Sequence, residues 1–134
     1  MTTKNEIEAF LQAETFGVVG ASNDRHKYGN KVLRGYLQNG MPAVPIHPSE
    51  SLVEGQKAYA RLAEAPAIEA ISIITPPPVT ESIVDTAIET GVKRIWMQPG
   101  AESKTAIERA TEAGLQVIAG GPCILVALRF REED

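Results

Sequence analysis

A glycine-rich turn near the start of the chain carries residue types suited to binding phosphate. Gly20, Ala21 and Ser22 follow the apolar run Phe16–Val19 and precede a segment with helical periodicity. Gly20 permits a tight turn, so main-chain N–H groups and the Ser22 hydroxyl can approach phosphate oxygens beside the positive end of a helix. The run lacks a complete Gly-x-Gly-x-x-Gly fingerprint. It therefore indicates either a phosphate-binding turn or a plain connection between strand and helix.

Further candidate residues follow other apolar runs, at points where predicted strands end. They are Ile46, His47 and Pro48, then Thr75, Pro76 and Pro77, then Gln98 and Gly100. Ligands of open parallel sheets bind outside the carboxyl ends of the strands, so these segments are expected to surround one site. No carboxylate follows the second strand to hold a nicotinamide cofactor's ribose, and this absence removes repulsion against a ribose phosphate. Lys27 and Arg25, shortly after the turn, are candidate partners for phosphate.

Alternating strand and helix patterns must position these segments. Five short apolar runs indicate strands, at residues 16–19, 43–46, 70–74, 94–97 and 116–118. Apolar residues at helical spacing predict helices at about 28–39, 79–88 and 106–110, and a capping box at Thr3–Glu6 predicts an earlier one. A loop is expected at 47–57, a short helix near 61–65 and an apolar turn after Cys123. This order predicts an α/β fold with a Rossmann-like, doubly wound, five-stranded parallel sheet, in a single domain spanning residues 1–134.

The composition excludes several classes of function. With 13 basic and 17 acidic side chains the formal net charge is -4, which argues against non-specific nucleic-acid binding. One cysteine and two histidines exclude a zinc site built from cysteine and histidine. The chain shows no secretory signal pattern and no apolar run near the roughly 20 residues of a membrane span. We therefore expect a cytoplasmic protein with no membrane partner.

Six segments, taken in their order and spacing, carry a family resemblance. The segments are Gly17–Ser22, Tyr28–Leu33, Val44–Pro48, Thr75–Pro77, Ile95–Ala101 and Ala113–Ile118. Together they resemble the small stand-alone CoA-binding domains, whose fold is similar to the N-terminal CoA-binding domain of the succinyl-CoA synthetase α subunit. The resemblance covers roughly residues 5–130. It implies coenzyme A or an acyl-CoA as the ligand.

The resemblance also implies a role for each strand end. Gly20, Ala21 and Ser22 would hold the phosphates of CoA. Residues 46–48 would flank the adenosine and residues 75–77 would line the opposite wall. Gln98 and Gly100 would lie toward the pantetheine arm.

The chain departs from the family's pattern in two places. The family often has Asn-Pro-Lys after its second strand, where this chain has His47-Pro48-Ser49. The family often has Arg-Cys near its C-terminus, where this chain has Pro122-Cys123. Cys123 is therefore interpreted either as a small buried apolar residue or as a thiol that forms a mixed disulfide with the CoA thiol.

No catalytic residue is assigned, because the chain lacks a nucleophile elbow and no carboxylate directly follows a predicted strand. The preferred function is a non-catalytic carrier or sensor that binds CoA or an acyl-CoA. One alternative is a subunit of an acyl-CoA ligase or transferase whose partner supplies the catalytic residue. The others are an NAD(P)-binding regulatory module and an oligomeric scaffold. Whether the partner is a second copy of the chain or an acyl-CoA enzyme is left open.

Overall fold

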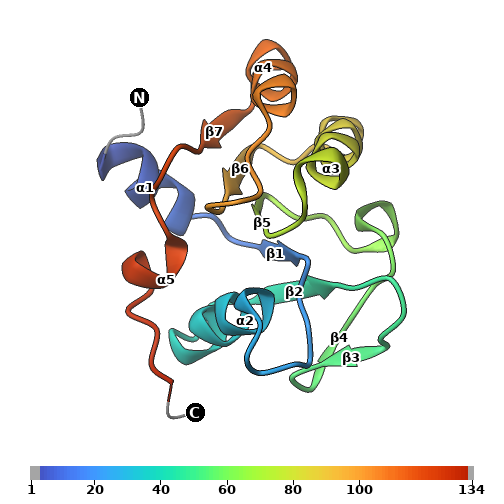
Figure 1. Cartoon of the computed structure of the whole chain (residues 1–134), viewed down its shortest axis with the longest axis vertical. Coiled ribbons are helices and arrows are strands. Elements are labelled where there is room, and N and C mark those ends of the chain that lie inside the picture. Colours follow the sequence, from blue (N-terminus) through green and yellow to red (C-terminus); the bar gives the residue numbers. More distant parts are fainter. Residues whose placement is uncertain (1–3, 133–134) are drawn as a thin grey trace.

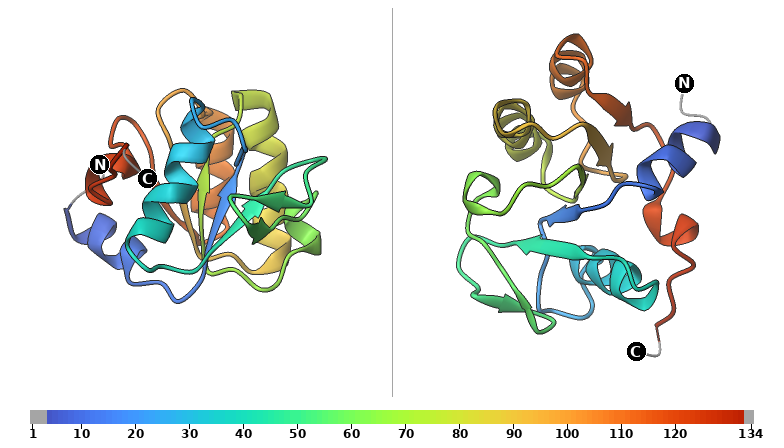
Figure 2. Two further views of the ribbon diagram at one scale, coloured as in Figure 1. Left: turned by 90° about the horizontal axis from the view of Figure 1, so that it is seen from below. Right: turned by 180° about the vertical axis from the view of Figure 1, so that it is seen from behind.

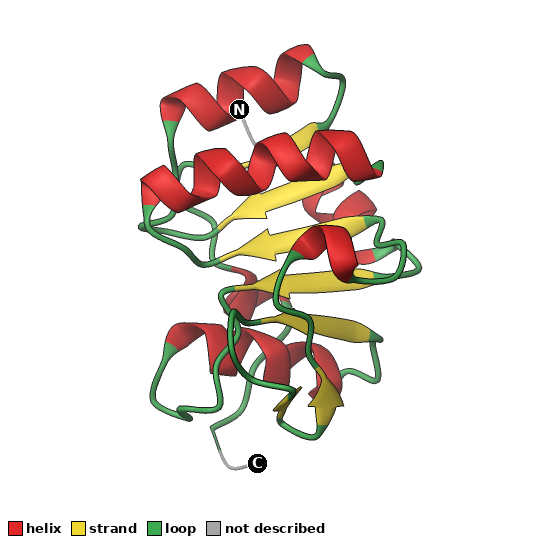
Figure 3. Cartoon of the chain, turned by 90° about the vertical axis from the view of Figure 1, so that its right-hand side faces the viewer, coloured by secondary structure: helices red, strands yellow, loops and turns green. Residues whose placement is uncertain are grey.

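One parallel sheet forms the centre of the protein. The computed structural model describes residues 4–132, and its main sheet has the strand order β2-β1-β5-β6-β7 (Figures 1 and 3). The strands are β1 (Phe16–Val19), β2 (Ala43–Ile46), β5 (Ala70–Ile73), β6 (Arg94–Met97) and β7 (Gln116–Ile118). All the pairings in this sheet are parallel. The predicted strands are therefore confirmed, except that β5 ends one residue earlier than predicted.

Helices cover both faces of the sheet, which confirms the doubly wound α/β prediction. Helices α1 (Lys4–Leu11), α2 (Tyr28–Gln38) and α5 (Ile124–Ala127) pack on one face. Helices α3 (Pro77–Thr90) and α4 (Lys104–Glu112) and the 3-10 helix η1 (Leu62–Glu64) pack on the other (Figure 2). Within residues 4–132, no helix is both long enough and apolar enough to cross a membrane.

Local chemistry accounts for where two of these helices begin. Pro77 is the first residue of α3, a position where a missing N–H costs nothing because no helical acceptor precedes it. Ser103 caps α4, and its Oγ accepts a hydrogen bond of 3.2 Å from the Ala106 N–H. Both helices therefore begin just beyond the carboxyl end of the preceding strand. The Thr3 cap predicted for the first helix lies outside the described residues.

The two faces of the sheet bury different kinds of side chain. Phe10, Phe16, Tyr36 and Trp96 are fully buried on the face under α1, α2 and α5. Phe10 meets Trp96 edge-on with ring centres 5.3 Å apart, and Phe16 lies 4.9 Å from Tyr36. The opposite face is aliphatic, with residues such as Ile71 on β5. The few aromatic residues of the chain therefore concentrate on one side of the sheet.

Two segments differ from the sequence prediction. The predicted loop at 47–57 contains an antiparallel hairpin of β3 (Leu52–Val53) and β4 (Gln56–Lys57). The two residues between them, Glu54 and Gly55, have φ of 49° and 78°, as a tight hairpin turn requires. The predicted apolar turn after Cys123 is the short helix α5. Strands of two residues are too short to show alternation, which is why the pattern did not reveal them.

The strand order creates a crevice at the carboxyl ends of β1 and β5. From β1 the chain crosses one face of the sheet through α2 to reach β2, and from β5 it crosses the other face through α3 to reach β6. The connections that leave β1 and β5 therefore diverge at these neighbouring strand ends. Such a switch point is where doubly wound sheets bind ligands.

A buried hydrogen bond joins the centre of the sheet to α2. Tyr36 Oη and Ser72 Oγ lie 2.7 Å apart, and both residues have no exposed surface. Burial raises the pKa of the Tyr36 hydroxyl, so it stays protonated. The pair thus fixes α2 over β5 by a polar contact within an apolar layer.

We predict that Ser72→Ala lowers the free energy of unfolding by about 1–3 kcal/mol, because the Tyr36 hydroxyl loses its buried partner. The double variant Ser72→Ala with Tyr36→Phe should lose less than the sum of the two single changes, since no polar group is then left unpaired. Urea unfolding of all four proteins measures the coupling. Strictly additive losses would contradict the prediction.

Candidate functional site

The turn after β1 is folded tightly against the next strand of the sheet. Gly20 has φ of 99°, a conformation that L residues rarely adopt. A Cβ at this position would lie 2.6 Å from the carbonyl oxygen of Ile74. The Gly20 N–H donates to the Ile46 carbonyl at 3.3 Å, so the turn also joins the end of β2. Any larger residue at position 20 would disturb the fold and the turn together.

A second glycine lets α2 begin directly on this turn. A Cβ on Gly29 would overlap the carbonyl oxygen of Gly20, so only glycine allows the first turn of the helix this close. Glycine destabilises helix interiors, so helix propensity does not explain Gly29. The close packing against the Gly20 carbonyl does. In dinucleotide-binding folds the last fingerprint glycine serves the same close packing of helix and strand.

Main-chain donors are concentrated where the turn meets the helix. Among residues 4–132, no acceptor is found for the N–H groups of Ala21 and Ser22, and no side chain caps the start of α2 at Lys27. Ser22 Oγ accepts from the Asp24 N–H at 3.0 Å, which leaves the hydroxyl hydrogen available for another partner. Helix N-termini carry a partial positive charge. The arrangement suits an anionic ligand such as a diphosphate.

A groove crosses the carboxyl ends of the strands and has this turn at one end. It consists of two adjoining hollows of about 410 Å³ and 290 Å³. The first is lined by Gly20, Ala21, Ser22, Lys27, Tyr28, Gly29, His47, Pro48, Ile74, Thr75 and Pro76, and the second by Ile74, Thr75, Pro76, Pro99, Gly100 and Ala101. We call these two hollows together the strand-end groove. Ile74, Thr75 and Pro76 are common to both hollows.

The structure brings most of the candidate residues to this groove. Gly20, Ala21, Ser22, Lys27, His47, Pro48, Thr75 and Pro76 line the first hollow and Gly100 lines the second. Three candidates line neither hollow. Ile46 is 4% exposed and packs in the aliphatic core, Gln98 is fully buried, and Pro77 is exposed as the first residue of α3. Contact of any of these residues with a ligand stays a prediction.

Gln98 belongs to a small polar cluster beneath the groove. Its Oε1 accepts hydrogen bonds of 2.9 Å from the Tyr28 hydroxyl and from the Ile124 N–H. The Tyr28 hydrogen is thereby used, so the Cys123 thiol donates to Tyr28 Oη over 2.6 Å. Burial and the neighbouring Cys123 raise the pKa of the Tyr28 hydroxyl, which keeps it a donor. Cys123 lines neither hollow, and its reaction with a CoA thiol stays a prediction.

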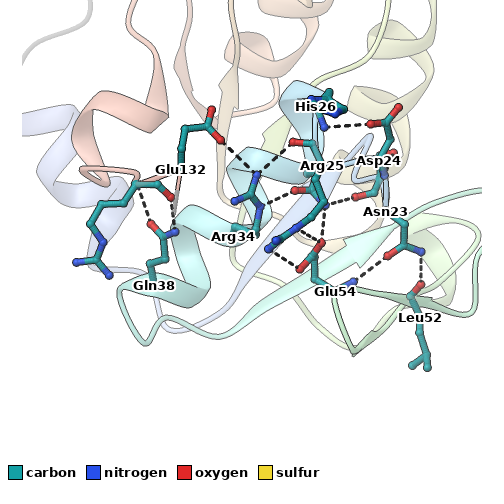
Figure 4. A network of polar contacts seen from close by, with 12 residues as sticks. Asn23, Asp24, Arg25, His26, Arg34, Gln38, Leu52, Glu54 and Glu132 are labelled. Atoms are coloured by element: carbon teal, nitrogen blue, oxygen red, sulfur yellow. Dashed lines mark hydrogen bonds and ion pairs between the residues drawn. The ribbon is translucent and has the colours of Figure 1, made fainter. Parts of the chain in front are cut away.

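A polar network attaches the hairpin of β3 and β4 to the turn after β1 (Figure 4). Asn30 Nδ2 donates to the Ser22 carbonyl and to Glu54 Oε2, both at 2.8 Å. Asn23 Nδ2 donates to the Leu52 carbonyl at 2.8 Å, and its Oδ1 accepts from the Glu54 N–H at 3.0 Å. The hairpin therefore helps to hold the turn in shape. Sequence reasoning missed this because the partners lie more than twenty residues apart.

Two arginines take part in the same network. Arg25 forms an ion pair with Glu54 over 3.2 Å. This contact directs the Arg25 side chain, a candidate partner for phosphate, toward the hairpin. Arg34 is 4% exposed, donates to Asn30 Oδ1 at 2.6 Å and lies 3.7 Å from Glu132. Lys31 on the same helix lowers the pKa of Glu132. Of the cations near the turn, Lys27 is the one that lines the groove.

The fold belongs to the doubly wound α/β class, and the groove lies where such sheets bind ligands. The profile of the CoA binding domain family matches residues 14–129, and the chain belongs to that family. The lining also contains residues that were not candidates: Tyr28, Gly29, Ile74, Pro99 and Ala101. Gly29 could have been found from the sequence, because a glycine destabilises a helix and so needs a structural reason. For Tyr28 the sequence left two interpretations, contact with a ligand and cover of the sheet edge.

The chain is similar to both small proteins and parts of larger enzymes. It is 28% identical over 131 residues to the α subunit of an ADP-forming acetate–CoA ligase II of Pyrococcus furiosus and spans 28% of that subunit. A conserved hypothetical protein of the same organism has 35% identity and a TM-score of 0.80, with 85% of this chain and 98% of that chain covered. A dinucleotide-forming acetyl-coenzyme A synthetase of Candidatus Korarchaeum cryptofilum, in complex with phosphate and ADP, has 26% identity and a TM-score of 0.76, with 86% of this chain and 27% of that chain covered.

We predict that Gly29→Ala destabilises the protein by about 1–3 kcal/mol or more, because the new methyl group meets the fixed Gly20 carbonyl. Gly35→Ala is the matched control on the same helix. Its Cβ meets side-chain atoms of Leu128 and Leu125 and no main-chain atom, the nearest being Leu128 Cδ1 at 3.1 Å, and alanine gains helix propensity of up to about 1 kcal/mol. Denaturant unfolding compares the two variants. Equal stability of both would show that the helix can move away from the turn at little cost.

Proposed function

We propose that the protein binds coenzyme A or an acyl-CoA in the strand-end groove. The observation that carries this proposal is the joining of the Gly20–Ser22 turn to the start of α2, with free main-chain donors and Lys27 at the same place. Membership of the CoA binding domain family supports the choice of ligand. A diphosphate is the part of CoA that such a cluster of donors fits best.

The shape of the groove supports one direction for the bound molecule. The diphosphate would lie on residues 20–22, with the adenosine against His47 and Pro48 at the end of β2. The pantetheine arm would run past Thr75 and Pro76 into the hollow at Gly100. Ile46, Pro77 and Gln98, which line neither hollow, would shape the walls rather than touch the ligand.

We propose that the chain by itself is a carrier or a sensor rather than a catalyst. No carboxylate or thiol is among the residues that line the groove. His47 also lacks the free lone pair that a base would need, because its Nδ1 accepts hydrogen bonds from two main-chain N–H groups and its Nε2 then carries the hydrogen. A CoA ligand and a single cysteine, which cannot form an internal disulfide, both support a cytoplasmic location.

A second candidate is a subunit of an acyl-CoA ligase, with the catalytic residues on a partner. The curated relative is such a subunit, and the region of it that resembles this chain is 28% of its length. Purification of the tagged protein from its native host would test it. Stoichiometric recovery of a chain that resembles the rest of that ligase supports the subunit, and recovery of the tagged chain alone or as a homodimer supports the stand-alone carrier.

We predict that CoA raises the melting temperature and binds in a titration calorimeter, whereas NAD⁺ does neither. Lys27→Ala should weaken CoA binding roughly three- to tenfold, with the larger loss at low salt, because an exposed charge near phosphate is screened by ions. Lys93→Ala, an exposed residue at the amino end of β6 and so at the opposite edge of the sheet from the groove, is the control and should bind CoA like the wild type.

Tighter binding of NAD⁺ than of CoA would replace the proposal with the NAD(P) alternative. Binding of neither ligand by a folded wild-type protein would refute it. Equal loss in both lysine variants would show that net charge, and not the groove, attracts the ligand.

A further inference from the structure

The imidazole of His47 is held to the main chain in one tautomer. His47 follows β2, and its Nδ1 accepts hydrogen bonds from the Ser49 N–H at 3.1 Å and from the Glu50 N–H at 3.0 Å. A ring nitrogen that accepts must present its lone pair, so it carries no hydrogen. The proton of the neutral ring therefore resides on Nε2.

The second nitrogen is left for a partner outside the chain. Because Nδ1 is bonded to the turn that follows His47, Nε2 on the far side of the ring points away from that turn. His47 lines the first hollow of the groove, and within residues 4–132 no acceptor is found for Nε2. Glu50, the nearest carboxylate in sequence, accepts from Asn23 Nδ2 at 3.2 Å instead. The groove thus gains a donor whose orientation is set by the main chain.

The position of His47 indicates which part of a nucleotide this donor meets. Val19 pairs with Ile46 in the parallel register of β1 and β2, so Gly20 and His47 occupy equivalent places just past the two strands. Neighbouring strands are about 4.8 Å apart. With the diphosphate on the turn, as proposed above, the ribose attached to it would lie about one strand spacing away. An acceptor oxygen on the ribose therefore falls within reach of Nε2.

We propose that His47 recognises the ribose of the bound nucleotide through a neutral Nε2–H donor, fixed by the two main-chain hydrogen bonds to Nδ1. The proposal rests on nucleotide binding in the strand-end groove. Neither Pro48 nor Ser49 supplies a cation at this strand end, so recognition here depends on a directed hydrogen bond rather than on charge. The acceptor is an oxygen of either the ribose 3′-phosphate or a ribose hydroxyl.

The tautomer can be measured without any ligand. In a long-range ¹H–¹⁵N correlation spectrum at pH 8, Nδ1 of His47 should show the shift of an unprotonated nitrogen and Nε2 that of a protonated one. His26, whose side chain is exposed, serves as the internal comparison. The opposite assignment, or an even mixture of tautomers at His47, would overturn the proposal.

Two substitutions separate the two ring nitrogens. His47→Asn keeps an acceptor near the position of Nδ1 and loses the donor, so it should unfold like the wild type but bind CoA about three- to tenfold more weakly. His47→Gln keeps a donor near Nε2 and loses the acceptor, so it should melt at a lower temperature yet bind CoA more tightly than His47→Asn. Wild-type affinity in His47→Asn would overturn the proposal while leaving CoA binding intact.

Dephospho-CoA distinguishes the two acceptors. If the oxygen belongs to the 3′-phosphate, His47→Asn should bind dephospho-CoA as well as the wild type does. If it belongs to a ribose hydroxyl, both ligands should lose affinity to the same extent. A wild-type protein that binds neither ligand would refute the proposed function and this proposal together, whatever the tautomer.

Discussion

The close approach of α2 to the end of β1 is the constraint on which the site depends. The helix can begin at this distance because Gly29 has no Cβ to meet the Gly20 carbonyl. Contact at this point aims the first N–H groups of the helix and those of the turn at one place and brings Lys27 to the same groove. The diverging connections after β1 and β5 leave the space that these donors face. The hydrogen bonds from Asn30 to the Ser22 carbonyl and to Glu54 hold this junction in place.

Much of the fold could be predicted from the sequence, because each strand of the main sheet is a short apolar run and the longer helices repeat apolar residues at helical spacing. The candidate site followed from the rule that parallel strands end on the same side. The rule predicts which segments meet but not where each side chain points. Ile46 turns into the aliphatic core, and Gln98 is drawn inward because its amide oxygen bonds to Ile124, a residue far along the chain. Contacts of that kind leave no local pattern.

Two side chains, one on β6 and one just past its end, bind the segment after β7 to the sheet. Trp96 Nε1 donates to the Pro122 carbonyl at 3.0 Å, and Gln98 Oε1 accepts from the Ile124 N–H. Tyr28 joins this arrangement from α2 through the same amide oxygen. The first turn of α2, the end of β6 and the start of α5 are therefore linked through one buried glutamine. Tyr28 also lines the first hollow, so this link connects the start of α5 to the groove.

The hairpin of β3 and β4 offers a site for a label close to the turn after β1. Asn23 reaches it through the carbonyl of Leu52, while the Leu52 side chain is 55% exposed. A fluorophore attached through a cysteine at position 52 would leave that main-chain bond in place and stand in solvent beside the turn. Because the native Cys123 is only partly exposed, labelling at the engineered position would be favoured. Such a label would report changes at the turn when a ligand enters the groove.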